Sequence, residues 1–304
     1  MARTASLLLA ACLVSQTHAL SIATLQSSLR ADPTAAQDWK ALGKLLSDAG
    51  EFAEADLVFR AGAARCPECD ELQHFERVAE AFRGDDDGEP FACRAADFVS
   101  FDVPEPPAGL DSGRRVVHAS KRPLVDKRAC AELVAGAEAA AAARGWTTDR
   151  HAHAPTCDVP AHDLPPAAAA VARAVVRRIL FPCATTLFPR LVDAARPPVV
   201  RDCFVIRYDA DGDAPGFASL KPHVDESLVS FTVPLNERDE YDDGGLFVAP
   251  TGDLINGDAG SVLCFYGGVP HGGYPISRGT RRVLTAFLVA GANASGQPPG
   301  YALP

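Results

Sequence analysis

The chain has 304 residues, a formal net charge of −10, 47% hydrophobic residues and 22% charged residues. This composition is typical of a globular protein, and the length allows one large domain together with a smaller one. The negative charge is not offset by any basic cluster, which argues against nucleic acid as a partner.

The first nineteen residues have the features of a signal peptide. Arg3 is the only charge, Ala5 to Val14 is an apolar run, and Ala19 is a small residue at the expected cleavage point. The run is too short to span a bilayer comfortably, although a retained N-terminal anchor is the alternative, and no other segment approaches the required span of about 20 residues. We therefore expect a protein of the secretory pathway, in the endoplasmic reticulum lumen or secreted, without a membrane span after cleavage.

Cysteine usage agrees with that compartment. Eight cysteines follow the signal segment: Cys66, Cys69, Cys93, Cys130, Cys157, Cys183, Cys203 and Cys264. An even number in an oxidising compartment predicts disulfides, but the spacing does not fix their pairing. Asn293 opens a glycosylation sequon.

Residues 20–85 are expected to be helical and to form a small tetratricopeptide-like segment. The signature is a large residue, then Leu-Gly, then small and aromatic packing positions, then proline. The residues that match it are Trp39, Leu42, Gly43, Leu46, Ala55, Phe59, Gly62 and Pro67. Pro33 and Pro67 also have the spacing of one repeat. A plain helical hairpin is the alternative, because an isolated repeat does not bury a core alone.

Glycine, aspartate and proline interrupt the helical pattern, so a linker is expected over residues 86–112. Residues 113–295 are expected to form one domain, followed by a tail at 296–304. The domain should contain helices at 125–144 and 165–180 and short strands at 115–119, 203–208, 228–236, 244–248, 261–266 and 282–289. Helices followed by short strands predict an α+β fold, with a β-sandwich or jelly roll backed by helices.

The main chemical motif is a pair of potential metal ligands at the start of a predicted strand. His223 and Asp225 are two residues apart, so both side chains point to one face of the strand. His271 comes directly after a later strand and could supply the third ligand. Two histidines and one carboxylate form the facial triad of non-haem iron oxygenases, which leaves positions open for co-substrate and oxygen. A single histidine is more often an ordinary core residue, so the prediction depends on the joint pattern.

A basic residue follows the triad at the start of the last apolar strand. Arg281 lies ten residues after the third candidate ligand. Its guanidinium can bind a carboxylate through two parallel hydrogen bonds and stays charged when partly buried. We expect it to bind the distal carboxylate of a 2-oxo acid. Thr285, on the same strand face, and Ser230 and Thr232, on the polar face of the alternating strand after the ligands, could line the same pocket.

These residues belong to a segment, Arg207 to Leu288, that resembles the catalytic domain of the prolyl 4-hydroxylase and lysyl hydroxylase superfamily. The matching stretches are RYDADGDAPGFASLKPHVDESLVSFTVPLN, DDGGLFVAPTGD and GSVLCFYGGVPHGGYPISRGTRRVLTAFL. Upstream, HAHAPTCDVPA and DCFVIRYDA also resemble family segments, so that the similarity covers roughly residues 115 to 290. The stretch from His271 to Arg281 is especially similar to the lysyl hydroxylase pattern.

The resemblance implies a double-stranded β-helix, iron(II), 2-oxoglutarate, oxygen, and ascorbate to keep the iron reduced. By position, the implied iron ligands are His223, Asp225 and His271. Arg281 would bind the C5 carboxylate of 2-oxoglutarate; collagen-type prolyl enzymes have lysine there, so arginine agrees with lysyl and oxygen-sensing members. Tyr208 matches a tyrosine that lines the co-substrate pocket. Pro234 stands where some members have another pocket tyrosine, which removes one hydrogen-bond donor.

The implied reaction is hydroxylation of a peptidyl prolyl or lysyl residue, with succinate and carbon dioxide as co-products. The substrate would be a peptide or protein, for which proline-rich or collagen-like sequences are candidates. The helical segment favours a prolyl substrate, because collagen prolyl hydroxylases carry a tetratricopeptide-like peptide-binding domain, whereas the stretch from His271 to Arg281 favours a lysyl substrate. The alternative is a catalytically degenerate oxygenase that acts as a lumenal peptide-binding protein.

Overall fold

The computed structural model describes residues 20–83, 88–104, 115–151, 154–211 and 217–291. The predicted signal segment, Asn293 and the predicted tail lie outside these residues. The chain divides within helix α4 into two compact units, the first up to Arg77 and the second from Val78 to Gly291. In the described part of the chain, no helix has the length and apolarity needed to cross a membrane.

The described part of the first unit is helical, as predicted. Residues 20–31 form a helix, and the elements that follow are α2 (Ala36–Asp48), α3 (Phe52–Arg65) and most of α4 (Asp70–Ala81). A Cβ atom on Gly43 would lie 2.4 Å from the Phe59 ring, and one on Gly62 would lie 2.7 Å from Trp39. The two glycines therefore let α2 and α3 pack closely, which gives a physical reason for the spacing in the sequence. The relation to tetratricopeptide repeats stays a prediction.

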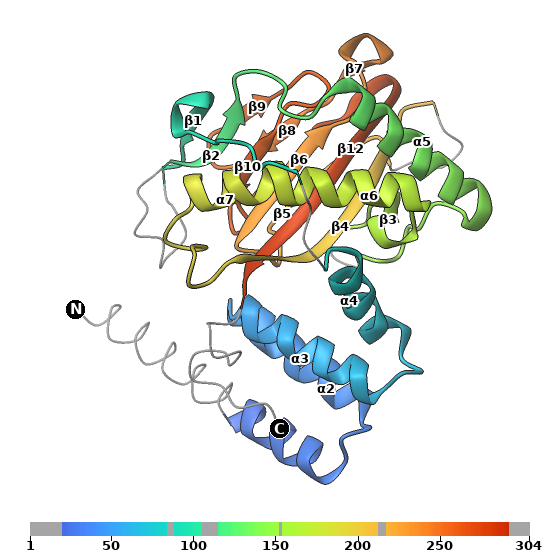
Figure 1. The fold of residues 1–304 in the computed structure, drawn as a ribbon, viewed down its shortest axis with the longest axis vertical. Helices are drawn as coiled ribbons and strands as arrows, with labels where there is room; N and C mark the ends of the chain where they lie inside the picture. Colours follow the sequence, from blue (N-terminus) through green and yellow to red (C-terminus); the bar gives the residue numbers. More distant parts are fainter. Residues whose placement is uncertain (1–19, 84–87, 105–114, 152–153, 212–216, 292–304) are drawn as a thin grey trace. The chain divides into compact units, whose positions relative to one another are not determined.

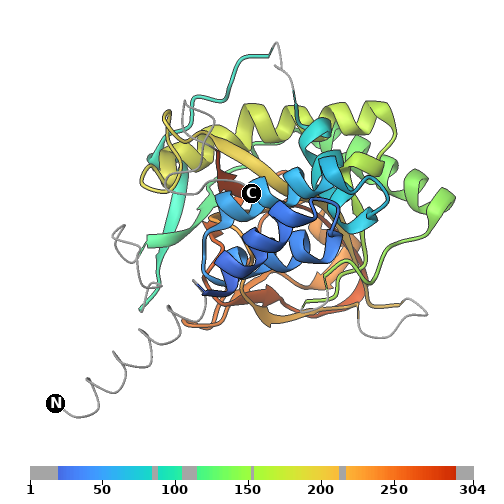
Figure 2. The same cartoon turned by 90° about the horizontal axis from the view of Figure 1, so that it is seen from below.

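The second unit has a layer of helices on one face of its larger sheet. These helices are α5 (Lys127–Arg144), α6 (Pro166–Val175), the π-helical turn Val176–Leu180 and α7 (Phe181–Leu187), with short 3-10 turns at Ala95–Asp97, Ala161–Asp163 and Arg238–Glu240. Figure 1 shows α6 and α7 following each other across the sheet, and in Figure 2 these helices lie along one side with strands along the other. Asp126 caps α5 by accepting from the backbone N–H of Ala129, and Gly145 (φ +85°) ends it.

Two antiparallel sheets form the rest of the unit. The larger one contains β1 (Phe98–Asp102), β2 (Arg115–Ser120), β10 (Leu263–Tyr266), β6 (Val229–Pro234), β12 (Ile276–Ala290), β4 (Pro198–Asp209) and β3 (Asp158–Pro160) in this order, with β7 (Tyr241–Asp243) paired to β12. The smaller one contains β5 (Leu220–His223), β11 (His271–Gly273), β8 (Leu246–Val248) and β9 (Asp253–Ile255). All of these pairings are antiparallel. The mixed helical and antiparallel-sheet architecture confirms the predicted α+β class.

The alternation predicted for β6 determines which side chains meet which layer. Val229, Phe231 and Val233 are fully buried in the core shared with the helices. Ser230 and Thr232 point to the opposite face, because successive side chains of a strand alternate. That opposite face packs against the smaller sheet through a second core, formed by Val116, Val117, Leu246, Val248, Ile255, Leu263 and Phe265, among others. The polar side chains of the predicted site therefore face the interior between the sheets.

The linker predicted at residues 86–112 is wrong for its central part. Strand β1 lies within it and pairs along β2 at the edge of the larger sheet. The segment before β1 is also fixed. Pro182 has no N–H to donate to the preceding turn of its helix, and the Arg178 carbonyl oxygen accepts instead from the N–H of Phe91 at 2.7 Å. Charge and proline in the sequence concealed a short edge strand that pairing stabilises.

All eight cysteines predicted to form disulfides are free thiols in the structure. Most of them are buried in apolar surroundings, where the neutral thiol is favoured over the thiolate. Burial raises the pKa of the Cys130 thiol to about 11. Cys130, Cys203 and Cys264, for example, are buried as small apolar side chains.

His118 on β2 is a buried histidine outside the predicted site, and it predicts a pH dependence. Its Nδ1 lies 2.9 Å from the Ser100 hydroxyl, and burial lowers its pKa from 6.5 to about 4. As the pH falls from 6.5 towards 4, the unfolded chain takes up a proton at this residue while the folded chain does not, so stability is lost. Between pH 7.5 and pH 5 this loss is about 2 kcal/mol.

The substitution His118→Asn removes this titration and keeps a polar group near Ser100. Urea unfolding of both proteins at pH 7.5 and pH 5 measures the effect. We expect the variant to gain about 2 kcal/mol relative to the unsubstituted protein on acidification. An equal pH dependence in the two proteins would contradict the assignment.

Candidate metal and carboxylate-binding site

The smaller sheet brings the three predicted metal ligands together. His223 ends β5 and His271 begins β11, and the two are direct partners across these strands. Asp225 follows β5 and is fixed by a hydrogen bond from its N–H to the Gly267 carbonyl at 2.9 Å. One potential ligand atom from each side chain lies within 4.8 Å of the others. Strand pairing and one turn thus produce the cluster.

The hydrogen bonds of the two imidazoles direct their Nε2 atoms at the carboxylate. His223 Nδ1 lies 2.9 Å from the Lys221 carbonyl, and His271 Nδ1 lies 2.8 Å from the Val269 carbonyl. Since a carbonyl can only accept, each Nδ1 carries a proton, and each ring in its neutral form offers its Nε2 lone pair. The Nε2 atoms lie 3.2 and 3.4 Å from the two Asp225 oxygens. Two lone pairs and a carboxylate facing one another fit a divalent cation.

Electrostatics at the triad agree with this donor set. Burial disfavours charge on Asp225, but the neighbouring histidines and Ser230 outweigh burial and hold the pKa of this carboxyl below its usual value. Burial lowers the pKa of His271. At His223, contact with Asp225 outweighs burial and raises the pKa. At neutral pH the triad therefore contains a carboxylate and at least one neutral imidazole, which are the forms that bind metals.

Arg281 occupies the interior of β12 without a matching carboxylate. Only 4% of the residue is exposed, and among the described residues no acidic side chain forms an ion pair with it. Its Nε is buried without a hydrogen-bond partner. The hydroxyls of Thr285 and Thr232 are also buried without partners, and these two residues face each other across β12 and β6. A buried cation and two unsatisfied hydroxyls on the same face of these strands fit a carboxylate ligand.

Tyr208 lies between the arginine and the triad. It is the partner of Arg281 across β4 and β12, and its ring centroid is 5.2 Å from the guanidinium carbon. Burial raises the pKa of its phenol, and the nearby guanidinium partly offsets this. A Cβ atom on Gly273 would lie 2.7 Å from the Tyr208 hydroxyl. Gly273 is two residues beyond His271, so Tyr208 links the two parts of the site.

Of the predicted co-substrate residues, Tyr208 contacts Arg281. Thr285 lies four residues further along β12 with Thr232 opposite it, and Ser230 contacts the triad instead. The Ser230 hydroxyl donates to Asp225 Oδ2 at 2.5 Å. Pro234 lies opposite Val283 on β12 and supplies no side-chain donor to the group. Ser230 is therefore a partner of a predicted metal ligand, and co-substrate binding by the other residues stays a prediction.

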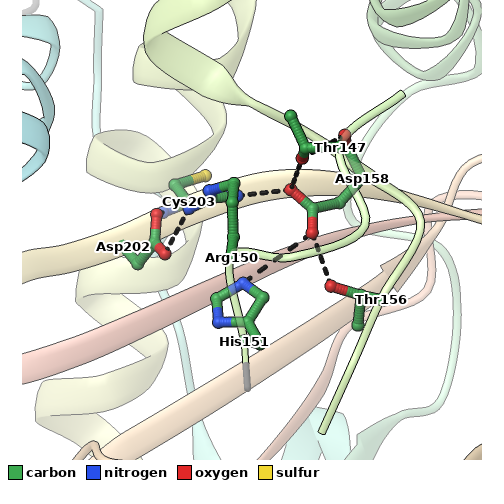
Figure 3. A network of polar contacts seen from close by, with 7 residues as sticks. All are labelled: Thr147, Arg150, His151, Thr156, Asp158, Asp202 and Cys203. Atoms are coloured by element: carbon green, nitrogen blue, oxygen red, sulfur yellow. Dashed lines mark hydrogen bonds and ion pairs between the residues drawn. The ribbon is translucent and has the colours of Figure 1, made fainter. Parts of the chain in front are cut away.

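A second buried polar network, which was absent from the sequence predictions, joins β3 and the residues before it to β4 (Figure 3). Asp158 is fully buried and accepts hydrogen bonds from Arg150, Thr147 and Thr156. Arg150 also donates to Asp202 at 2.6 Å. Although burial lowers the pKa of Arg150, the two carboxylates outweigh burial and raise it. The network fixes the chain before β3 against β4.

Aromatic contacts connect this network with the strands of the site. The guanidinium of Arg150 lies 5.2 Å from the Phe204 ring centroid, and His151 lies 4.7 Å from it. Phe204 contacts Phe287, with 5.5 Å between ring centroids. Phe287 is the β12 partner of Ser230 on β6. The only signal of the buried polar network in the sequence was the charged residue Asp158 within an otherwise apolar stretch.

Comparisons with known proteins gave matches among solved structures only. No family model matches the chain, and neither does any curated protein.

A viral collagen prolyl hydroxylase from Paramecium Bursaria Chlorella virus-1, in a 2OG complex, is 13% identical to this chain with a TM-score of 0.43. The match covers 60% of this chain and 100% of that chain. A prolyl-4-hydroxylase from Pseudomonas putida is 22% identical with a TM-score of 0.40, covering 56% and 90%. A 2OG-Fe(II) oxygenase family oxidoreductase from Burkholderia pseudomallei is 16% identical with a TM-score of 0.38, covering 57% and 97%. Because these TM-scores are below 0.5, the function proposed next rests on the residues of this chain.

Proposed function

We propose that this protein is an iron(II)- and 2-oxoglutarate-dependent dioxygenase that hydroxylates a peptidyl prolyl or lysyl residue. One observation carries the proposal: a His-Asp-His donor set is connected, through Tyr208, to a buried guanidinium without a carboxylate partner. Each part alone occurs in proteins of other activities. Together they match a molecule that has a 2-oxo acid at one end and a carboxylate at the other.

The roles of the residues follow from their contacts. The side chains that would hold iron are His223, Asp225 and His271. When bound there, iron(II) would supply oxygen activation coupled to the decarboxylation of 2-oxoglutarate to succinate and carbon dioxide. Arg281 would bind the distal carboxylate through two parallel hydrogen bonds. The hydroxyls of Thr232 and Thr285 would donate to the same carboxylate, and the dry interior would exclude water from it.

Further parts of the proposal rest on the resemblance in sequence. We propose that the two facing sheets form a double-stranded β-helix and that ascorbate keeps the iron reduced. The HVDES and PHGGYPISRGTR stretches support a prolyl or lysyl substrate within a peptide, with proline-rich and collagen-like sequences as candidates. The apolar segment at residues 1–19 supports activity in the secretory pathway.

The test is succinate formation by the purified full-length protein. It is incubated with iron(II), ascorbate, oxygen and labelled 2-oxoglutarate, with and without collagen-like, proline-rich and lysine-bearing peptides. We expect succinate above a metal-free control, and mass spectrometry should detect one added oxygen atom on a prolyl or lysyl residue of one peptide class. Peptide binding that ignores iron and 2-oxoglutarate, with no succinate under any condition, would instead indicate a degenerate oxygenase that binds peptides.

A further inference from the structure

Two buried serines form a chain of hydrogen bonds that ends on the central carboxylate of the triad. The Ser227 and Ser230 hydroxyl oxygens lie 2.7 Å apart, and Ser230 lies 2.5 Å from Asp225 Oδ2. Both serines are fully buried. Ser227 belongs to the turn after β5, whereas Ser230 belongs to β6 of the larger sheet. These hydrogen bonds therefore connect Asp225, which follows a strand of the smaller sheet, with a strand of the larger sheet.

The direction of each hydrogen bond follows from counting protons. An ionised carboxylate can only accept, so the Ser230 hydroxyl donates to Asp225. A serine hydroxyl has a single proton, which leaves Ser230 able only to accept from Ser227. The order is therefore Ser227 to Ser230 to Asp225, with no alternative while the carboxylate is charged. This fixed polarity distinguishes the arrangement from a contact between two freely rotating hydroxyls.

The neighbouring residues leave space for the two serine hydroxyls and shield them from water. A Cβ atom on Gly267 would lie 2.3 Å from the Ser227 hydroxyl oxygen and 2.4 Å from the Ser227 carbonyl oxygen. The partners of Ser230 on the neighbouring strands are Phe265 and Phe287. Aromatic neighbours keep the hydroxyls away from water, and hydrogen bonds are stronger in such an environment.

We propose that Ser230, supported by Ser227, is a positioning residue that sets the rotation and donor strength of the Asp225 carboxylate towards the metal. The inference rests on the metal site of the proposed function. Asp225 Oδ1 faces His223 Nε2, and Oδ2 faces both His271 Nε2 and the Ser230 hydroxyl. A hydrogen bond to Oδ2 prevents the carboxylate from rotating and withdraws charge from that oxygen. Groups that orient a metal ligand in this way typically contribute about 10- to 100-fold to metal affinity.

The experiment is a titration of the metal-free full-length protein with cobalt(II), followed by the visible absorption of the bound metal. This readout requires neither co-substrate nor turnover. For Ser230→Ala we expect the cobalt Kd to rise about 10- to 100-fold, with a changed visible spectrum. Ser230→Thr keeps the hydroxyl and should return the Kd to within about threefold of the original, since the donor is restored. Ser227→Ala should give a smaller rise than Ser230→Ala.

A matched control is Ser261→Ala, which removes a buried serine hydroxyl elsewhere in the same unit and should leave the cobalt Kd unchanged. If Ser230→Ala does not fold, as judged by circular dichroism, Ser227→Ala decides the question, because Ser230 itself stays in place. An unchanged Kd and spectrum in the folded serine variants would overturn the positioning role while leaving the proposed dioxygenase intact. If the unsubstituted protein binds neither cobalt nor iron, both proposals are overturned.

Discussion

Replacing Arg281 with glutamine is expected to raise the KM for 2-oxoglutarate about a hundredfold, because losing a charge-assisted pair in a buried site costs about 3 kcal/mol. The guanidinium has no carboxylate partner among the described residues, so its charge is neutralised only when a ligand arrives. Glutamine keeps hydrogen-bonding capacity but has no charge. Initial rates of succinate formation at varied 2-oxoglutarate measure the effect.

The neighbouring residue provides the control for Arg281→Gln. Arg282 points to the helical face, where its Nε donates to Glu138 at 2.8 Å, so Arg282→Gln should leave the KM unchanged. A second readout is thermal unfolding without metal or peptide. 2-Oxoglutarate should raise the Tm of the unsubstituted protein and of Arg282→Gln but not that of Arg281→Gln. Equal effects of the two substitutions would argue against a specific carboxylate site.

Replacing His271 with alanine is expected to abolish stoichiometric metal binding and to lower turnover at least about a thousandfold, since outer-shell substitutions alone cost 10- to 100-fold. His271 is 5% exposed, and its ring lies 4.4 Å from that of Phe265, centroid to centroid. No other described residue joins His223 and Asp225 as a ligand in the cluster. Metal content after dialysis, measured by mass spectrometry, should fall from about one to near zero per chain, as expected when an open three-ligand site loses a ligand.

Stability separates the loss of metal from a loss of fold in His271→Ala. Metal at a hundred times its Kd should stabilise the unsubstituted protein by about 2.7 kcal/mol and the variant not at all. The control is His118→Asn, which alters a buried histidine away from the triad and should retain the metal-dependent gain. Normal metal content in folded His271→Ala would show that the histidine is not a ligand.

The triad could be predicted because its geometry follows from local rules. Two side chains at positions i and i+2 of a strand share a face, and a histidine at the start of a later strand can reach them. The placement of Thr285 on the same strand face as Arg281, with Thr232 opposite it, follows from the same alternation. Strand phase gives the face that a side chain occupies but not its neighbour on that face. Ser230 was therefore assigned to the arginine, although the turn that holds Asp225 at Gly267 places the carboxylate beside it.

The parts that could not be predicted depend on contacts between distant segments. Arg150 and Asp202 are separated by 52 positions in the sequence, and only the pairing of β3 with β4 places both beside Asp158. Similarly, β1 is a short apolar segment between stretches rich in charge and proline, and it forms a strand because β2 is available to pair with it. Propensity is a weak guide where tertiary pairing determines the conformation.

Strand β1 also bears on the solubility of the protein. An uncovered strand at the edge of a sheet offers a row of free N–H and C=O groups to other chains, which promotes aggregation. β1 covers β2, and it is itself a poor template, since it has only five residues, contains an irregularity in register between Phe101 and Asp102, and ends in a charge. The segment that resembled a linker in the sequence thus protects the larger sheet from pairing with other molecules.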